Sequence, residues 1–101
     1  MSKSYKLTNE AVADLIDIMT YTLDTWGDIQ VESYRDQLES RLQSSAQFPD
    51  IGRKHPMLPK HIYYIAEGKH YIFYKKMTTG IEVIRLLHHS TDFIAHLSGK
   101  L

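Results

Sequence analysis

Apolar residues recur at intervals of three and four along the first half of the chain, behind a short alternating segment. Residues 3–7 alternate polar and apolar side chains and include two lysines, which predicts an edge strand. From Thr8 or Asn9, either of which is a good N-cap, the spacing predicts an amphipathic helix that Gly27 ends. Its expected apolar face consists of Val12, Leu15, Ile16, Met19, Leu23 and Trp26.

A second helix is predicted directly after this glycine. Asp28 is its expected cap, and Pro49 stops it. Its apolar stripe consists of Val31, Tyr34, Leu38, Leu42 and Ser45 and runs to Phe48. Because the connection is so short, the two helices are expected to form an antiparallel hairpin.

The second half of the chain predicts a loop, a β-meander and a short helix. Residues 49–60 contain all three prolines and are expected to be irregular, and the strands follow at residues 62–66, 70–77 and 81–87. Ser90 or Thr91 is the expected cap of a final helix with Gly99 beyond its end. The apolar face of that helix consists of Phe93, Ile94 and Leu97.

The turns predict the register of the meander. A two-residue Glu67–Gly68 loop would pair Ala66 with Lys69, Tyr64 with Tyr71 and Ile62 with Phe73, and a three-residue loop at 78–80 would pair Met77 with Ile81. Lys76 would then oppose Glu82 and Phe73 would oppose Arg85.

This register gives the sheet two apolar faces. The first, expected to receive the helical hairpin, carries Tyr63, Ile65, Ile72, Tyr74, Ile84 and Leu86. The second carries Ile62, Tyr64, Tyr71, Phe73, Lys75, Val83, Arg85 and Leu87. An antiparallel sheet usually leaves one face wet, so something is expected to cover the second: the C-terminal helix, a protein partner or a nucleic acid.

Length and composition fit a small α+β domain. The 101 residues are expected to form one domain, 1–101: an N-terminal edge strand, an antiparallel helical hairpin packed on a small antiparallel sheet in the order β-α-α-β-β-β, and a short C-terminal helix. The chain has no cysteine, and no apolar run resembles a signal peptide or a membrane span. We therefore expect a cytoplasmic protein that does not bind membranes.

The net charge of zero conceals two oppositely charged halves. Residues 1–50 hold four Lys or Arg and nine Asp or Glu, whereas residues 51–101 hold eight and three and contain all six histidines. The basic half is the expected docking region for an anionic partner, although charge segregation within one fold is an alternative.

The residues offer little specific catalytic chemistry. His89, Asp92 and His96 have helical spacing, but with no cysteine and no HExxH motif we expect neither a metal nor a cofactor, and Asp92 is better interpreted as stabilising a helix N-terminus. Neither a GxSxG elbow nor a glycine-rich phosphate loop is present.

A ribonuclease arrangement remains chemically coherent. Basic side chains and an imidazole could surround an RNA phosphate, and aromatic side chains could stack on bases, although packing is their commoner role. The basic candidates are Arg53, Lys54, Lys75, Arg85 and His88 or His89, and the aromatic ones are Tyr64, Tyr71 and Phe73.

Several short motifs follow one another in a recognisable order. The N-terminal strand leads to Ala13-Asp14-Leu15 and Tyr21, then Trp26-Gly27, and then Tyr34 and Leu38. Further along come Pro49, Gly52-Arg53, His70-Tyr71-Ile72-Phe73-Tyr74, Arg85-Leu86-Leu87-His88 and Asp92. These motifs extend over nearly the whole chain, and in this order the chain resembles the ParE/RelE superfamily of type II toxin–antitoxin toxins, most closely its ParE branch.

The resemblance implies a toxin that inhibits DNA gyrase and blocks replication without being an enzyme. A cognate antitoxin with a DNA-binding N-terminal domain and an acidic C-terminal segment would neutralise it in a hetero-oligomer. That segment is expected to cover the second sheet face and the neighbouring helical hairpin. The residues expected to bind the target or the antitoxin are Arg53, Tyr64, Tyr71, Phe73, Lys75, Arg85 and His88.

Two alternatives stay open. RelE-like relatives cut messenger RNA on the ribosome, and for that activity the catalytic candidates are Arg53, Lys54, Arg85 and His88. Residues 97–101 lack the terminal aromatic or imidazole side chain of those nucleases, so the sequence favours the nuclease less than the gyrase inhibitor. The other is an inactive protein with the toxin fold. Arg53 and Arg85 are expected to matter more for toxicity than for folding.

Overall fold

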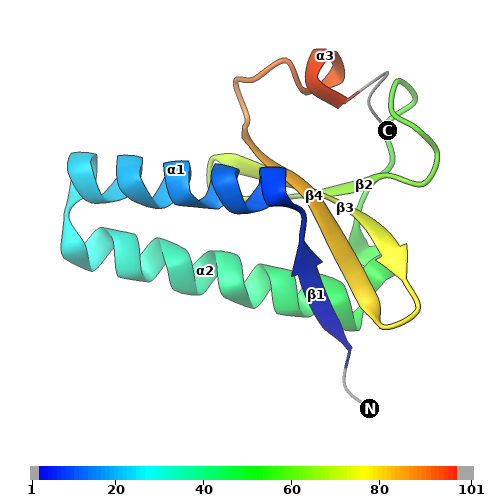
Figure 1. The fold of residues 1–101 in the computed structure, drawn as a ribbon, viewed down its shortest axis with the longest axis horizontal. Coiled ribbons are helices and arrows are strands. Elements are labelled where there is room, and N and C mark those ends of the chain that lie inside the picture. The colour runs from blue at the N-terminus through cyan, green and yellow to red at the C-terminus, as the bar shows by residue number, and fades with distance from the viewer. Residues whose placement is uncertain (1–2, 98–101) are drawn as a thin grey trace.

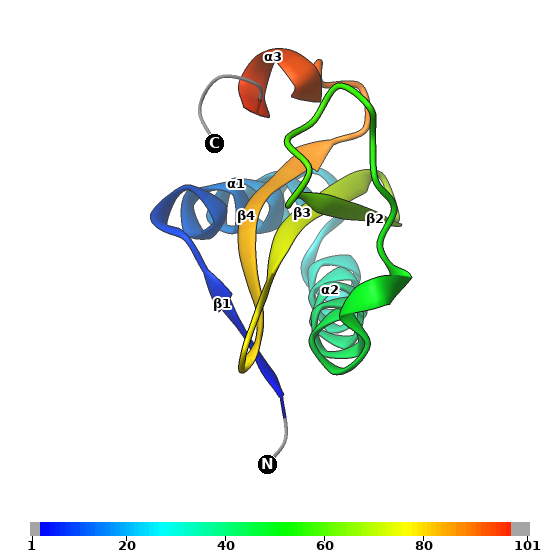
Figure 2. The ribbon, with the colours of Figure 1, turned by 90° about the vertical axis from the view of Figure 1, so that its right-hand side faces the viewer.

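A four-stranded sheet lies between a helical hairpin and a smaller C-terminal layer (Figures 1 and 2). The computed structural model describes residues 3–97. The elements are β1 (Ser4–Leu7), α1 (Asn9–Trp26), α2 (Asp28–Gln47), the 3-10 turn η1 (Pro49–Ile51), β2 (Tyr63–Glu67), β3 (His70–Met77), β4 (Gly80–His88) and α3 (Phe93–Leu97). The predicted α+β fold is confirmed, and each predicted strand lies within one residue of the observed one.

The sheet has the order β1-β4-β3-β2, so β1 is an edge strand as predicted. It pairs parallel to β4, with Ser4 opposite Gly80, whereas β2, β3 and β4 form the antiparallel meander. The sheet is therefore mixed. The hairpin of α1 and α2 forms the connection that brings the chain from β1 back to the other strands (Figure 1).

The helix boundaries follow the predicted caps with one correction. The Thr8 hydroxyl accepts a hydrogen bond from the Ala11 N–H at 3.1 Å and donates one to the Ile84 carbonyl at 2.8 Å, which ties the start of α1 to β4. Gly27 has a φ of +91° and links the two antiparallel helices. Asp28 is the first residue of α2 rather than its cap, and no side chain caps that end.

The predicted buried face of α1 is wrong in most positions. Ala11, Ile18 and Thr22 form the buried stripe, where the Thr22 hydroxyl donates to the Ile18 carbonyl at 2.7 Å. The small side chains of Ala11 and Thr22 let the helix approach the sheet closely. Leu15 and Met19 pack against the core, but the other predicted positions are exposed: Val12, Ile16, Leu23 and Trp26. The stripe of α2 is confirmed at Leu38, Leu42 and Ser45, which are buried, but Phe48 at its predicted end is 66% exposed.

The register of the first hairpin differs from the prediction. Glu67 pairs with His70 and Tyr64 pairs with Phe73, so the turn is Gly68–Lys69. Gly68 has a φ of +57°, whereas no described non-glycine residue has a positive φ. The first central residue of such a two-residue turn needs a positive φ, which glycine adopts readily. The turn therefore lies at Gly68–Lys69, one residue further along the chain than predicted.

The second hairpin also departs from the prediction because of a β-bulge. Phe73 opposes Arg85 as predicted, but Lys75 opposes Glu82, and a register shift at Phe73 and Tyr74 leaves Ile84 as the extra residue. Val83 therefore packs on the hairpin side and Ile84 on the other side, the reverse of the prediction. Lys75 forms an ion pair with Glu82 at 3.3 Å, and Lys76 instead binds Asp50.

The second sheet face is covered by the chain itself. Phe73, Ile84 and Leu87 are buried with Leu58 and Ile62 of the loop before β2 and with residues of α3 (Figure 2). Asp92, rather than Ser90 or Thr91, accepts the Ala95 N–H at the start of α3, which agrees with its predicted helix-stabilising role. Gly99 lies outside the described residues.

No helix within residues 3–97 is both long and apolar enough to cross a membrane.

Candidate functional site

The predicted aromatic site is a buried cluster rather than an open surface. Tyr64 lies 5.5 Å from Tyr71 and 5.9 Å from Phe73, measured between ring centroids, and Phe93 of α3 lies 5.2 Å from Phe73. Phe73 has no exposed surface, and Tyr64 and Tyr71 are half-buried. The structure brings the three predicted aromatic residues together, but α3 occupies the face on which an antitoxin or bases were expected to dock.

Arg85 is held by a partner that the sequence did not predict. Its Nε and Nη2 donate to the Asp14 carboxylate at 2.7 and 2.9 Å, and the Leu86 N–H donates to the same carboxylate at 2.9 Å. The hydrogen bonds to Asp14 raise the pKa of Arg85 above its ordinary value. Arg85 thus joins β4 to α1.

The loop after α2 presents two exposed basic side chains on a well-anchored backbone. The buried Tyr74 hydroxyl donates to the Pro49 carbonyl at 2.7 Å and accepts the Gly52 N–H at 3.0 Å. Arg53 exchanges two backbone hydrogen bonds with Tyr64, at 2.8 and 2.9 Å, so its side chain does not hold the loop.

Lys54 lies beside a tyrosine that a second lysine also approaches. The Lys54 ammonium lies 5.1 Å and the Lys76 ammonium 4.8 Å from the ring centroid of Tyr63. Three exposed cations therefore lie near Tyr63 and η1: Arg53, Lys54 and Lys76 of β3. A cationic surface of this kind can attract an anionic partner.

The four nuclease candidates do not form one contact network. Arg53 and Lys54 belong to the loop before β2, Arg85 is bound to Asp14, and His88 ends β4 beside Ser90, with 2.7 Å between its Nδ1 and the Ser90 Oγ. Within residues 3–97 no hydrogen bond, ion pair or ring contact joins the loop residues to Arg85 or His88.

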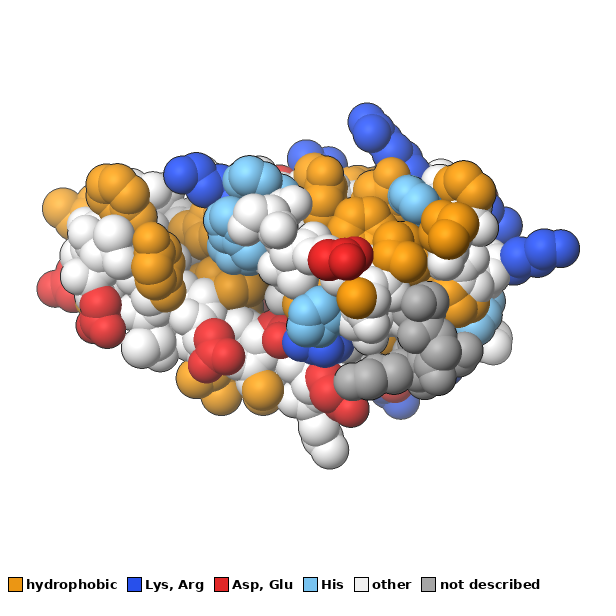
Figure 3. Space-filling model, turned by 90° about the horizontal axis from the view of Figure 1, so that it is seen from above, with side chains coloured by type: hydrophobic (Ala, Val, Ile, Leu, Met, Phe, Trp, Pro, Cys, Tyr) orange, Lys and Arg blue, Asp and Glu red, His pale blue; other side chains and the backbone are white. Residues whose placement is uncertain are grey.

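A groove lies between the helical hairpin and the ends of β3 and β4. It has a volume of about 860 Å³ and is largely apolar, with Ile18 and Leu86 among its lining residues. Tyr21 and Trp26 of α1 line its helical side. Seen from above, the molecule is hollowed here, with histidine side chains gathered beside the hollow (Figure 3). Lys69, His70 and His88 line that side.

A hydrogen-bonded pair fixes this wall of the groove. The Tyr34 hydroxyl of α2 donates to the Glu67 carbonyl at 2.9 Å and lies 2.6 Å from Nδ1 of His70. Burial raises the pKa of Tyr34 to about 12. Burial, with the neighbouring His88 and His89, lowers the pKa of His70 to about 4, so this imidazole is neutral near pH 7.

The groove was missed by sequence reasoning, apart from His88. Its residues come from both helices and two strands, so no single local motif marks it. Several of them belong to the short motifs singled out in the sequence, and only the fold brings these together: Asp14, Tyr21, Trp26, Tyr34, His70 and Leu86. Tyr34 was assigned to the apolar stripe of α2 for its ring, and its hydroxyl gave no separate signal. The nearest signal in the sequence was the HYIFY segment, where a histidine, His70, stands directly before four apolar or aromatic residues of a predicted strand.

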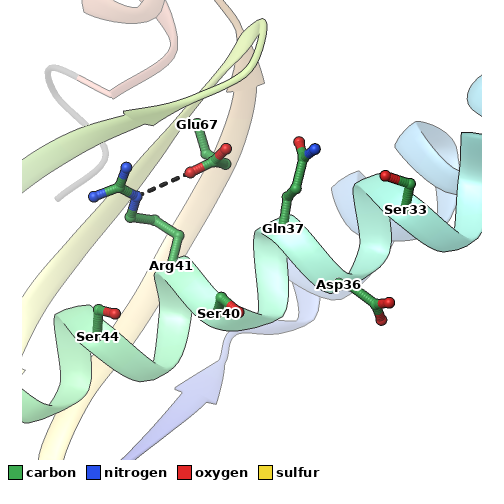
Figure 4. A pocket seen from close by; sticks show the side chains of 7 residues that line it. All are labelled: Ser33, Asp36, Gln37, Ser40, Arg41, Ser44 and Glu67. Carbon is green, nitrogen blue, oxygen red and sulfur yellow. Dashed lines mark hydrogen bonds and ion pairs between the residues drawn. The ribbon is translucent and has the colours of Figure 1, made fainter.

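A second, polar hollow lies along the outer side of α2. Ser33, Ser40 and Ser44 line it, and Arg41 points toward Glu67, with 2.9 Å between Nε and the carboxylate (Figure 4). This ion pair joins α2 to the end of β2. Because its polar groups are small or already paired, the hollow is better explained as structure than as a binding site.

Among residues 3–97, no three His, Asp or Glu side chains converge as metal ligands do.

Comparison with known proteins gives one consistent result. Residues 5–93 match the family described as "ParE toxin of type II toxin-antitoxin system, parDE". The chain is 36% identical over 95 residues to Toxin ParE1 of Caulobacter vibrioides, and this alignment covers 94% of this chain and 98% of that protein. It is 34% identical over 93 residues to Toxin ParE1 of Mycobacterium tuberculosis strain H37Rv, covering 91% and 95%.

The fold agrees with a solved structure titled "Chromosomal ParDE TA system from P. aeruginosa". The TM-score is 0.70 at 16% sequence identity, and the alignment covers 86% of this chain and 96% of the other. At this identity the likeness concerns the fold.

Proposed function

This chain belongs to the ParE toxin family of type II toxin–antitoxin systems, and we propose that it stops growth by inhibiting DNA gyrase until a cognate antitoxin neutralises it. The observation that carries the proposal is the family match, which runs from residue 5 to residue 93 and so includes almost every element of the fold. The resemblance to the ParE branch, rather than to the RelE branch, supports gyrase as the target.

The arrangement of the basic residues favours a binding mechanism over RNA cleavage. A ribonuclease needs an acid–base group and a cation around one phosphate. Here Arg85 is paired with Asp14, and His88 makes its polar contacts within its own segment, with Ser90. Arg53 and Lys54 remain available on the surface, where they can contact an anionic target without any proton transfer.

The target assignment has a direct test. Purified protein is added to gyrase with relaxed plasmid, and to ribosomes carrying a message, at equal concentrations. We expect loss of supercoiling or accumulation of the cleaved-DNA complex, with the message left intact. Cleavage of the message without an effect on gyrase would replace this proposal with ribosome-dependent ribonuclease activity.

The groove beside α1 is the surface that best fits an acidic antitoxin segment. It is largely apolar, with Ile18 and Leu86 in its lining, and it carries Lys69 on the side of β3 and Asp14 and Asp17 on the side of α1. An amphipathic segment gains burial there, and acidic side chains on its β3 side gain attraction to Lys69. The second sheet face, by contrast, is already filled by Phe93 and Leu97. The proposed antitoxin site is therefore this groove and not the second sheet face.

Charge reversal tests whether the antitoxin binds the groove or another part of the basic surface. The variant Lys69→Glu with His88→Glu should bind the small protein encoded beside this gene at least about tenfold more weakly. Lys60→Glu is the matched control because it is an exposed lysine outside the groove. Equal affinity for all three proteins would exclude the groove as the antitoxin site.

A further inference from the structure

The sheet edge outside β2 carries a cation on each of its two sides. Arg53 forms an antiparallel bridge with Tyr64, so the chain that leads from η1 adds a short segment to this edge (Figure 2). Side chains directly opposite each other across such a bridge lie on the same side of a sheet, and consecutive side chains alternate. Tyr64 packs on the α3 side and Tyr63 on the side of the helical hairpin. Arg53 therefore lies on the α3 side of the edge, whereas Lys54, with its ammonium 5.1 Å from the ring centroid of Tyr63, lies on the hairpin side.

A third cation lies on the hairpin side. The Lys76 ammonium is 4.8 Å from the same ring centroid, so it is at most about 10 Å from that of Lys54. Lys76 is paired with the exposed Asp50, whereas neither Arg53 nor Lys54 forms an ion pair with another of the described residues. Residues 51–66 contain no acidic residue. The edge therefore carries a surplus of positive charge that the chain itself does not neutralise.

The backbone that carries Arg53 and Lys54 is held in place on both sides of them. Before them, the Tyr74 hydroxyl anchors η1, as described above. After them, the His55 carbonyl accepts the Leu58 N–H at 3.0 Å, and the His55 Nδ1 accepts the Met57 N–H at 3.0 Å. Leu58 is itself buried under α3. A partner that binds these cations therefore has to order their side chains but not the loop, which lowers the entropic cost of binding.

We propose that this edge, formed by Arg53, Lys54 and Lys76, binds the sugar–phosphate backbone of duplex DNA. A duplex presents a phosphate strand on each side of a groove, so the cations on the two sides of one edge each meet phosphates. Lys54 and Lys76 are close enough together to contact neighbouring phosphates of one strand. Such contacts depend on charge and position and do not read the base sequence.

Two other anionic partners fit the edge less well. Single-stranded nucleic acid is usually held by exposed rings on which its bases stack, but Tyr64, Tyr71 and Phe73 are buried or half-buried. A single strand or helix of an acidic protein would contact one side of the edge and leave the cation on the other side unused. Such a segment gains more where apolar surface accompanies the charge, as it does in the groove beside α1.

This inference rests on the proposed function for its setting, because the gyrase of that proposal holds DNA. There the edge would contact DNA bound to gyrase, and the positive charge of the toxin would add affinity for the complex. Binding to DNA itself needs no gyrase, so the purified chain alone can test it.

Fluorescence anisotropy of a labelled duplex of about 20 base pairs measures this binding at a series of salt concentrations. We expect a Kd that is the same for unrelated sequences and a binding constant that falls with salt at a log–log slope of about −2 to −3. Arg53→Ala with Lys54→Ala should weaken binding at least about tenfold at low salt and reduce the slope by about two. Lys3→Ala with Lys6→Ala is the matched control, because it removes the same charge from two exposed lysines at β1, the opposite edge of the sheet.

A charge-preserving variant separates loss of charge from loss of structure. Arg53→Lys with Lys54→Arg should bind within about threefold of the wild type, and circular dichroism checks that each variant is folded. No binding at about 20 mM salt, or equal weakening in the two alanine double variants, would overturn the proposal. Tighter binding of polyglutamate or of a single strand than of the duplex would also overturn it and assign the edge to that partner.

The same proteins, assayed with gyrase, separate this inference from the proposed function. Inhibition of gyrase by a chain that does not bind DNA would overturn the inference and leave the proposed function intact. Binding of DNA through this edge without any effect on gyrase would support the inference and remove the proposed function.

Discussion

Asp14 and Arg85, 71 residues apart in the sequence, form a two-pronged ion pair that fastens the first helix to the last strand. Both side chains are mostly buried, with 13% and 20% of their surfaces exposed. Asp14 also accepts the Leu86 N–H, so both oxygens of its carboxylate have partners. Arg85 therefore has a structural role, whereas the sequence alone suggested a role mainly in toxicity.

Arg85→Leu is accordingly expected to destabilise the fold. Removing the guanidinium leaves the Asp14 carboxylate partly buried without its cation, which costs about 2 kcal/mol of unfolding free energy. Urea denaturation of Arg85→Leu, Asp14→Leu and the double variant measures the coupling. If the two single losses simply add in the double variant, the side chains are not coupled and this interpretation fails.

Gly80 is expected to tolerate a side chain less well than Gly27. A Cβ on Gly80 would lie 1.7 Å from the Ser4 carbonyl oxygen, and its φ is +139°, whereas a Cβ on Gly27 meets nothing within 4 Å and faces only the strain of a φ of +91°. Gly80→Ala should therefore lose the β1–β4 pairing and more stability than Gly27→Ala, by about 2 kcal/mol. Comparable melting temperatures for the two variants would contradict this account.

His70 predicts a specific dependence of stability on pH. Its pKa falls from an ordinary value of 6.5 to about 4 in the folded protein, because the ring is buried beside Tyr34 and two other histidines. Below pH 6.5 the unfolded chain takes up this proton first, so stability decreases as the pH falls toward 4 and levels off below it. Partial solvent exposure limits the loss to the order of 1 kcal/mol.

The His70→Gln variant isolates this contribution. Its unfolding free energy should fall less between pH 7 and pH 4 than that of the wild type, whereas the exposed His61→Gln should follow the wild type. A profile for His70→Gln as steep as the wild type would assign the pH dependence to other groups.

The elements were predictable because their ends carry strong local signals. Thr8 caps α1 with its hydroxyl, Gly27 separates the two helices and Pro49 stops α2, and each of these effects acts within a few residues along the chain. The β-bulge at Ile84 has no such signal, since it depends on how β4 meets β3 and β1 together. This extra residue places Val83 and Ile84 on the opposite faces from those predicted. Because both residues are apolar, the hydrophobic pattern could not reveal the exchange.

The face of α1 was mispredicted for a physical reason that bears on function. The large apolar side chains form one arc and the small ones, Ala11 and Thr22, form another, and the sheet packs against the small arc because it permits closer approach. Hydrophobicity alone favours the large arc. The groove was equally hidden, because Tyr34, Lys69 and His88 meet only after the hairpin packs on the sheet.

Arg53 offers the cleanest test of a role in toxicity. Its backbone, rather than its side chain, makes the bridge to Tyr64, and the loop is anchored separately by Tyr74. Arg53→Ala together with Lys54→Ala should therefore change stability by less than about 0.5 kcal/mol while removing two exposed positive charges. If this surface contacts an anionic part of the target, the concentration needed to inhibit gyrase should rise by about tenfold at low salt, and the difference from the wild type should shrink at high salt. Lys60→Ala is the control, as a third exposed cation of the same loop. A folded double variant as inhibitory as the wild type would show that the target contacts another surface, and the groove beside α1 would then be the next to test.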